Sequence, residues 1–352
     1  ALVGAVLTVL LSLFSVGLAD AKGPPDPHPG SENGKAKGHE VDLQILALND
    51  FHGNLAPPSG SSGRVGDVDA GGAEYLATHI AQLERGVKNS IVVSAGDLIG
   101  ASPLLSALFH DEPTIEAMNM IGLDLNAVGN HEFDEGTAEL LRMQRGGCHP
   151  VDGCLDGDGF AGADFEFLAA NVVSRDTGRT LFPPYSIRSF NGAKVAFIGM
   201  TLEGTPMIVS PAGVAGYDFL DEADTVNALI KRLKRRGIET IVVLLHEGGY
   251  PTGTYNECPG ISGPIVDIVE RTDKEVDLFI TGHTHQAYNC IIDGRPVIEK
   301  HVAGMRLAHL ARLEAQLPES RASSSHHLEV LTLLRQLDAS ITRMAGWALD
   351  LS

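Results

Sequence analysis

The chain has 352 residues, 43% of them hydrophobic and 20% charged, which is typical of globular proteins with a sizeable core. Its 45 acidic residues outnumber 26 basic ones, so the formal net charge is −19 at pH 7. This charge offers no basic surface for DNA or RNA, and we expect no nucleic-acid polymer as partner. A small phosphorylated substrate is compatible with it if metal ions supply positive charge.

Residues 1–21 are predicted to be a secretory signal peptide. Residues 1–18 are apolar and uncharged, and Ala19 and Ala21 place small residues where signal peptidase reads. A membrane anchor is the competing interpretation, but these small residues and the polar segment after them favour cleavage, which would leave no stable membrane span. Because the chain begins with Ala1 and lacks a basic segment before the apolar run, we expect the extreme N-terminus to be missing.

Residues 22–40 are rich in Gly, Pro and Lys and are predicted to form an exposed linker. From Val41 onward, apolar runs alternate with segments of helical periodicity, which predicts an α/β fold. The expected helices are residues 73–83, 103–109, 113–121 and 221–236. Outside the candidate site, the expected strands are residues 165–173 and a hairpin of 185–190 with 194–200 around Asn191-Gly192.

Five apolar runs, each interpreted as a buried strand, deliver residues that bind metals or handle protons. The runs are residues 41–48, 90–100, 125–128, 240–245 and 277–281. The polar residues at their ends are Asp50, His52, Asp97, Asn130, His131, His246, His283 and His285. Such residues at the carboxyl edge of an α/β sheet are placed for chemistry. A single histidine on an apolar strand is more often a satisfied core residue than a ligand, but five such strand ends by accident are improbable.

Seven of these residues offer oxygen or nitrogen ligands without any thiolate. They are Asp50, His52, Asp97, Asn130, His246, His283 and His285. This set suits two divalent ions of the Mn²⁺, Zn²⁺ or Fe²⁺ type better than one. With one bridging carboxylate the ions would lie ~3.5–4 Å apart, a spacing that clamps the attacking and leaving oxygens of a phosphoryl displacement.

The ordered motifs resemble those of the calcineurin-like metallophosphoesterases. They are Asp50-Phe51-His52, Gly96-Asp97, Gly129-Asn130-His131-Glu132, His246 and Gly282-His283-Thr284-His285. The strings NDFHGN and GNHEFD are similar to those of the secreted 5'-nucleotidase branch, which includes UDP-sugar hydrolases and 2',3'-cyclic-nucleotide phosphodiesterases. The resemblance spans about residues 41–297. It implies a four-layer α/β/β/α sandwich and a secreted, dinuclear metal-dependent hydrolase of a small phosphorylated substrate, most simply a nucleotide.

The resemblance also implies individual roles. The first ion would be held by Asp50, His52, Asp97 and His285, and the second by Asp97, Asn130, His246 and His283. His131, oriented by Asp134, would form the catalytic dyad. Water acidified between the ions would attack phosphorus as hydroxide, while His131 stabilises the developing charge or protonates the leaving oxygen.

The four cysteines are interpreted through the predicted export to an extracellular, periplasmic or cell-wall location. Cys148 and Cys154 are close in sequence and most simply form a local disulfide. Cys258 and Cys290 flank the last histidine motif and form a second candidate pair, although four cysteines allow three connectivities.

The catalytic domain is expected to cover residues 41–313, followed by an atypical tail over residues 314–352. Nucleotidases of the resembled branch carry a second domain that clamps the base, and the residues from Glu299 onward do not resemble the expected final strands. A metal-binding but inactive fragment or binding module is therefore the alternative to an enzyme. The retained His131 and Asp134 favour the enzyme. The sequence does not indicate an oligomeric state.

Overall fold

The computed structural model describes residues 41–57, 64–65, 68–69, 71–155, 157, 159–253, 258–299 and 311–316. The predicted signal peptide and linker, and the predicted tail beyond residue 316, lie outside the described residues. Among the helices of the described part, none combines the length and apolarity that a membrane crossing requires.

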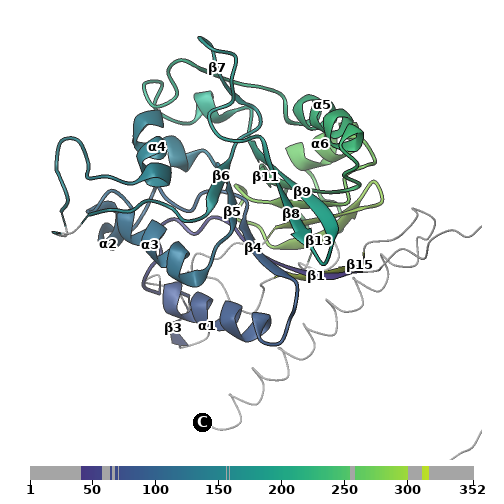
Figure 1. The fold of residues 1–352 in the computed structure, drawn as a ribbon, viewed down its shortest axis with the longest axis horizontal. Coiled ribbons are helices and arrows are strands. Elements are labelled where there is room, and N and C mark those ends of the chain that lie inside the picture. The colour runs from purple at the N-terminus through teal and green to yellow at the C-terminus, as the bar shows by residue number, and fades with distance from the viewer. Residues whose placement is uncertain are drawn as a thin grey trace, which may run out of the picture. The chain divides into compact units, whose positions relative to one another are not determined.

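Two β-sheets form the middle of the fold (Figure 1). The first has the order β15 (Ala311–Gln316), β1 (Asp42–Leu48), β4 (Ser90–Ser94), β5 (Leu125–Ala127) and β6 (Glu166–Leu168). The second has the order β13 (Tyr288–Ile292), β14 (Arg295–Glu299), β12 (Leu278–Thr281), β11 (Thr240–His246), β9 (Ala193–Thr201) and β8 (Tyr185–Phe190). The strands are parallel except at β15, β13 and β8, which pair antiparallel at sheet edges.

Helices lie on the outer side of each sheet (Figure 1). The first sheet is accompanied by α1 (Ala73–Glu84), α2 (Leu104–Ala107), α3 (Glu112–Ile121), the 3₁₀ turn η2 (His131–Phe133) and α4 (Thr137–Arg145). The second carries α5 (Glu222–Arg235) and α6 (Pro264–Arg271). The smaller elements are β2 (Arg64–Val65) with β3 (Val68–Asp69), β7 (Val172–Ser174) with β10 (Tyr217–Phe219), and η3 (Thr205–Met207).

Alternate residues of the central strands enter different apolar layers. In β1, Leu43 and Ile45 pack between the two sheets, whereas Leu46 and Leu48 pack beneath the helices of the first sheet. Strand β11 repeats this arrangement, with Leu244 between the sheets and its neighbours facing α5 and α6. Both faces are buried, which explains why these strands are apolar without alternation. The layers form the expected α/β/β/α sandwich.

The predicted helix at residues 221–236 is confirmed as α5. Its N-cap, Asp221, accepts a hydrogen bond of 2.8 Å from the backbone N–H of Asp224. Val226, Leu229 and Leu233 are buried at helical spacing, and basic residues end the helix where its dipole favours cations. The predicted hairpin around Asn191-Gly192 is confirmed by the pairing of β8 with β9.

The prediction of one strand at residues 165–173 is wrong. The segment forms β6 in the first sheet and β7 in a separate two-stranded sheet with β10. Between them, the Asn171 amide donates to the carbonyls of Thr201 and Leu220 and accepts from the N–H of Thr201. These bonds anchor the chain to the second sheet and end its pairing with the first.

The residues from Glu299 onward, which do not resemble the final strands expected from the family, include a further strand in the structure. Strand β15 pairs with β1 over six residues, from Asp42 opposite Gln316 to Ala47 opposite Ala311. It crosses the predicted limit between catalytic domain and tail at residues 313 and 314. The limits of the domain stay predictions, and the first sheet extends past the predicted limit at residue 313 to Gln316.

Both candidate disulfides are formed. Cys148 and Cys154 close a short loop with a Cα separation of 4.7 Å. Cys258 and Cys290, with a Cα separation of 5.5 Å, join the loop before α6 to β13. The described chain contains no free cysteine.

Thiol titration of the denatured, unreduced protein should therefore detect no free thiol. Removing the second bridge (Cys258→Ser with Cys290→Ser) should cost more free energy of unfolding than removing the first (Cys148→Ser with Cys154→Ser). Chain entropy gives about 4 kcal/mol for the 32-residue separation and about 2 kcal/mol for the 6-residue separation. Urea denaturation measures both. Four free thiols, or a larger loss from the shorter loop, would contradict this expectation.

Candidate metal centre

The carboxyl ends of five strands from the two sheets meet at one place. Strands β1, β4 and β5 of the first sheet end just before the predicted site residues Asp50, His52, Asp97, Asn130 and His131. Strands β11 and β12 of the second sheet end at or before His246, His283 and His285. Backbone bonds join neighbouring loops, from Asp50 N–H to the Gly96 carbonyl and from His52 N–H to the Asp97 carbonyl.

The side chains of Asp50, His52 and His285 form one half of this cluster. The Nε2 atoms of His52 and His285 are 3.2 Å apart. Asp50 Oδ1 lies 3.4 Å from His285 Nε2 and 4.0 Å from His52 Nε2. Four ligand atoms at ~2.0–2.1 Å in a tetrahedron would be separated by roughly 3.4 Å, so the spacing suits a shared ion.

The other half contains Asn130, His246 and His283. His246 Nε2 lies 3.2 Å from Asn130 Oδ1, and its ring centroid is 5.4 Å from that of His283. Asp97 lies between the halves, with Oδ2 at 3.0 Å from His246 Nε2 and 3.8 Å from His52 Nε2. The structure thus brings together all seven residues predicted as ligands, with one carboxylate in the middle.

Backbone carbonyls orient two of the imidazoles. His52 Nδ1 donates to the carbonyl of Gly100 at 2.9 Å, and His246 Nδ1 donates to the carbonyl of Ala95 at 2.7 Å. Because a carbonyl only accepts, Nδ1 carries the proton in both rings. Nε2 is therefore the nitrogen that each ring turns toward the cluster, and it offers its lone pair there when the ring is neutral, as in metal-binding histidines whose other nitrogen donates to a carbonyl.

Five of the seven residues have left-handed backbone conformations. The φ angles are 51° for Asp50, 46° for His52, 53° for Asp97, 74° for His283 and 52° for His285. Residues other than glycine rarely adopt this region, and sparsely populated conformations cost of order 1–3 kcal/mol each. Such strain persists where the surrounding structure dictates the placement of a functional side chain.

Burial and mutual charge set the ionisation of the cluster. Burial opposes ionisation of Asp97, but the charge and hydrogen bond of His246 outweigh it and hold the Asp97 pKa below its usual range. Burial works against the imidazolium, but Asp97 raises the pKa of His246 to about 10. Burial, and then the charge of His246, lower the pKa of His283 to about 4, so this ring is neutral at neutral pH. The carboxylates thus create a negative potential that attracts cations, and the neutral ring offers a lone pair.

Two glycines leave the space that these side chains occupy. A Cβ on Gly129 would lie 2.2 Å from Asp97 Oδ1 and 2.6 Å from the backbone nitrogen of Asp97. A Cβ on Gly96 would lie 2.6 Å from His246 Nδ1, and the φ of Gly96 is 99°. Larger residues at either position would displace the carboxylate or the imidazole.

His131 and Asp134 lie beside this cluster and face solvent. Asp134 Oδ2 accepts from His131 Nδ1 at 2.7 Å, and both side chains are about one-third exposed, 34% and 36%. The bond to Asp134 is the main reason that the pKa of His131 is raised. The imidazolium of His131 therefore persists to higher pH than that of an ordinary histidine. Its Nε2–H takes no part in the bond to Asp134.

Glu132 and Glu299, for which the sequence predicts no role, both support the site loops. The buried Glu132 carboxylate accepts from the backbone N–H groups of Asp97, Leu98 and Gly129 at 2.6–3.0 Å. Glu299 accepts from the Thr284 hydroxyl and from the Gln286 N–H at 2.9 Å, which fixes the His283–His285 loop. Glu132 lies inside the quoted GNHEFD string, which was an available signal, whereas nothing local marks Glu299.

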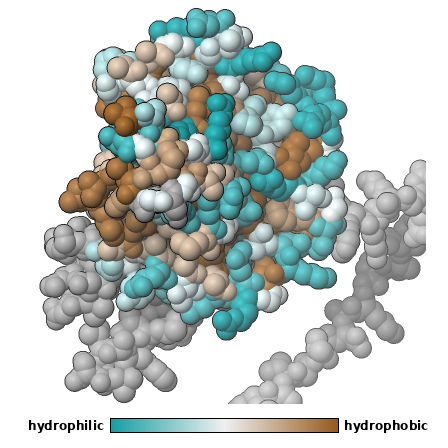
Figure 2. Space-filling view, turned by 60° about the vertical axis from the view of Figure 1, so that its left-hand side comes forward, coloured by the Kyte–Doolittle hydropathy of each residue, from teal (hydrophilic) through white to brown (hydrophobic). Residues whose placement is uncertain are grey.

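Hydrophobic side chains gather on the side of the molecule that carries α2 (Figure 2). In α2 and just after it, Leu104, Leu105 and Leu108 are 73%, 56% and 57% exposed. This helix begins four residues after Gly100, whose carbonyl holds His52. An exposed apolar surface of this kind commonly marks a binding surface.

The chain is similar to known phosphoesterases over most of the described fold. A family model described as calcineurin-like phosphoesterase matches residues 43–287. The chain is 37% identical over 263 residues to the endonuclease YhcR of Bacillus subtilis, covering 74% of this chain and 21% of that protein. It is 29% identical over 248 residues to a 5'-nucleotidase of Vibrio cholerae, covering 69% of this chain and 40% of that protein.

A solved structure, the NAD nucleotidase of Haemophilus influenzae, has a TM-score of 0.56 and 25% identity to this chain. The similarity covers 75% of this chain and 45% of that one. The chain thus spans less than half the length of each of these three proteins. The shared fold and the match to the family model over residues 43–287 lead to one conclusion: the chain belongs to the calcineurin-like phosphoesterase family.

Proposed function

We propose that this chain is the catalytic domain of an exported, dinuclear metal-dependent phosphoester hydrolase of the 5'-nucleotidase type. The main support is the convergence of seven oxygen and nitrogen ligands from five strand ends. Five of them lie on left-handed backbone around the central carboxylate of Asp97. The donor set fits the divalent ions that this family typically binds.

Two ions are assigned to the cluster, sharing Asp97. The first takes Asp50, His52, Asp97 and His285, and the second takes Asp97, Asn130, His246 and His283. Bound there, such ions supply Lewis acidity toward a phosphoryl group and lower the pKa of water. The chain's part is to hold two dications with the negative charge of Asp50 and Asp97, to keep the imidazole lone pairs inward, and to fix the geometry through carbonyls and Glu132.

His131 is assigned the proton transfer to the leaving oxygen. Its Nδ1 is held by Asp134, so the opposite nitrogen of the imidazolium carries a proton toward solvent and substrate. Its raised pKa keeps that proton in place to higher pH than in an ordinary histidine. Its ring lies edge-on to that of His52, with centroids 5.1 Å apart, which places it beside the proposed metals.

The proposed substrate is a small nucleotide. The relatives include proteins named 5'-nucleotidase and NAD nucleotidase, and the exposed leucines of α2 offer an apolar surface near the centre for an uncharged part of such a substrate. Another relative is named endonuclease, but the net charge of −19 favours small substrates over polynucleotides. Export is supported by the two disulfides and the signal-like first residues.

The purified chain tests this function directly with p-nitrophenyl phosphate, AMP and single-stranded DNA. Phosphate release from the two small esters, with intact DNA, is the expected result. Cleavage of DNA alone would replace the proposal with a nuclease. No turnover of any substrate, with metal bound, would favour the alternative of an inactive binding module.

Two divalent ions bound at the candidate centre of each chain, and loss of turnover on chelation, are expected. Asp97→Asn should weaken both sites because the shared carboxylate loses its charge, whereas Asn130→Ala should weaken mainly one. Elemental analysis after dialysis measures the ions. One ion or none in the wild type, with turnover unaffected by EDTA, would contradict the dinuclear assignment.

Gly129→Ala should lower metal content and turnover together, because its Cβ displaces the carboxylate of Asp97. A matched control is Gly159→Ala, since a Cβ there meets nothing within 4 Å. Circular dichroism confirms that both variants fold. Full metal content in folded Gly129→Ala would show that Asp97 is not held as tightly as proposed.

His131→Ala should leave metal content nearly intact and lower turnover by about 10²–10⁴-fold, the usual contribution of a general acid. The loss should be larger for AMP than for p-nitrophenyl phosphate, whose leaving oxygen needs little protonation. Asp134→Asn should cause a smaller loss. It should also move the alkaline limb of the pH profile to lower pH, because it removes the main cause of the raised His131 pKa.

These outcomes separate catalysis from metal binding. If His131→Ala strips a metal, the histidine is a ligand. If both substrates slow equally, its role is electrostatic stabilisation. If the alkaline limb of the pH profile stays at the same pH in Asp134→Asn, a group other than His131 produces that limb.

A further inference from the structure

A second group of metal-type side chains lies outside the candidate centre. His110, Glu135, Glu139 and His149 each offer one ligand atom, and these four atoms lie within 4.8 Å of one another. They come from four segments: the turn before α3, the turn after η2, α4, and the loop closed by Cys148 and Cys154. The proposed reaction uses none of them.

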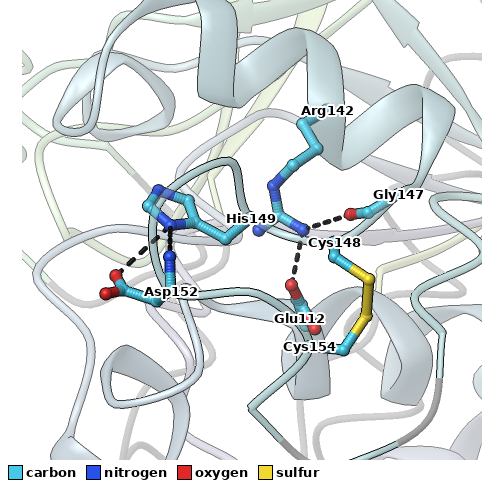
Figure 3. Close-up of a disulfide and its surroundings, with 7 residues drawn as sticks. All are labelled: Glu112, Arg142, Gly147, Cys148, His149, Asp152 and Cys154. Atoms are coloured by element: carbon cyan, nitrogen blue, oxygen red, sulfur yellow. Dashed lines mark hydrogen bonds and ion pairs between the residues drawn. A yellow bond between two sulfur atoms is a disulfide. The ribbon is translucent and has the colours of Figure 1, made fainter.

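The disulfide loop fixes the position of His149 (Figure 3). The carbonyl of His149 accepts from the N–H of Gly153 at 2.9 Å, so the loop is a tight turn closed by both the backbone and the disulfide. Arg142 holds the loop from α4 by donating to the carbonyl of Gly147 at 2.7 Å (Figure 3). The backbone that carries His149 is therefore held in one conformation before any ligand binds.

The two imidazoles are stacked. The ring centroids of His110 and His149 are 3.9 Å apart with an angle of 12° between their planes. Their side chains are 18% and 15% exposed, so they are largely shielded but reachable from solvent. His110 Nδ1 is 2.8 Å from Glu135 Oε2, and its Nε2 is 3.0 Å from Asp152 Oδ2.

One contact in the group conflicts with hydrogen bonding alone. His149 Nδ1 is 3.2 Å from the backbone nitrogen of Asp152, an N–H donor, and also 3.2 Å from Asp152 Oδ2, an acceptor. The nitrogen cannot accept from the first and donate to the second at once. If Nδ1 is unprotonated, its lone pair faces those of Asp152 Oδ2. If Nδ1 is protonated, its N–H faces the backbone N–H of Asp152. In the neutral ring with its proton on Nδ1, which faces Asp152 Oδ2, the Nε2 lone pair is left to bind a cation.

The charges of the group also favour a cation. Four carboxylates lie here, those of Glu112, Glu135, Glu139 and Asp152, and the guanidinium of Arg142 pairs with Glu112 and Glu139.

We propose that His110, Glu135, Glu139 and His149 bind a further divalent ion of the zinc type, separate from the candidate centre. Two imidazoles and two carboxylates match the four-coordinate sites of Zn²⁺, whereas Ca²⁺ and Mg²⁺ prefer oxygen ligands alone. The ion joins the disulfide loop to α4 and to Glu135. Because Glu135 directly follows Asp134, which holds His131, this site braces the segment behind the dyad.

The test measures bound zinc per full-length chain by elemental analysis after dialysis against dilute Zn²⁺. The double variant His110→Ala/His149→Ala should bind one ion fewer than the wild type. His79→Ala, a half-buried histidine on α1 outside both groups, is the matched control and should bind as the wild type does. The decisive quantity is a difference, so the result does not depend on how many ions the candidate centre holds or on whether the chain is active.

Glu135→Gln/Glu139→Gln is a second double variant, and it preserves side-chain size. It tests whether the additional zinc ion binds here if the double histidine variant does not fold. It should weaken binding of the additional zinc at least tenfold. Zinc should also raise the Tm of the wild type more than that of either variant. Equal zinc content in wild type and folded variants, even with a lower Tm in the variants, would overturn the proposal and leave a hydrogen-bonded network.

Discussion

The packing of the two sheets against each other is the constraint on which the candidate centre depends. Ile45, Val93 and Leu125 of the first sheet share one apolar layer with Leu244 and Ile280 of the second. Because all five side chains lie two to five residues before the polar site residues, burying them also brings the carboxyl ends of their strands together. The free energy of apolar burial thus positions polar groups that would otherwise stay apart in water.

The polar cluster is costly by itself, since buried carboxylates, imidazoles and left-handed backbone all oppose folding. The surrounding backbone offsets part of this cost. Carbonyls of Ala95 and Gly100 fix the imidazoles, and Glu132 accepts three N–H groups from the loops that carry Asp97 and Asn130. Bound divalent ions would offset more, so we expect occupancy of the centre and stability of the fold to be linked.

The two groups of metal-binding side chains differ in burial and in the elements that supply them. Five of the seven residues of the candidate centre are buried, and the centre comes from strand ends and contains strained backbone. The group at His110 and His149 is half-buried and comes from turns, a helix and a disulfide loop. The first arrangement suits chemistry on a substrate, and the second suits a brace between segments. Cys148–Cys154 then contributes through the placement of His149 as well as through chain entropy.

The sequence by itself indicated the alternation of strands and helices and the candidate ligands and dyad, because apolar runs and motifs encode these locally, but it left the disulfide pairing open, which the structure decided. Only the tertiary structure decided which strands share a sheet, and that residues 165–173 divide at Asn171, whose partners lie at Thr201 and Leu220. Only it placed Glu299 beneath the last histidine loop. A contact between residues far apart in the chain produces no recognisable pattern in the sequence around either residue. Such contacts are therefore determined only by how the elements pack.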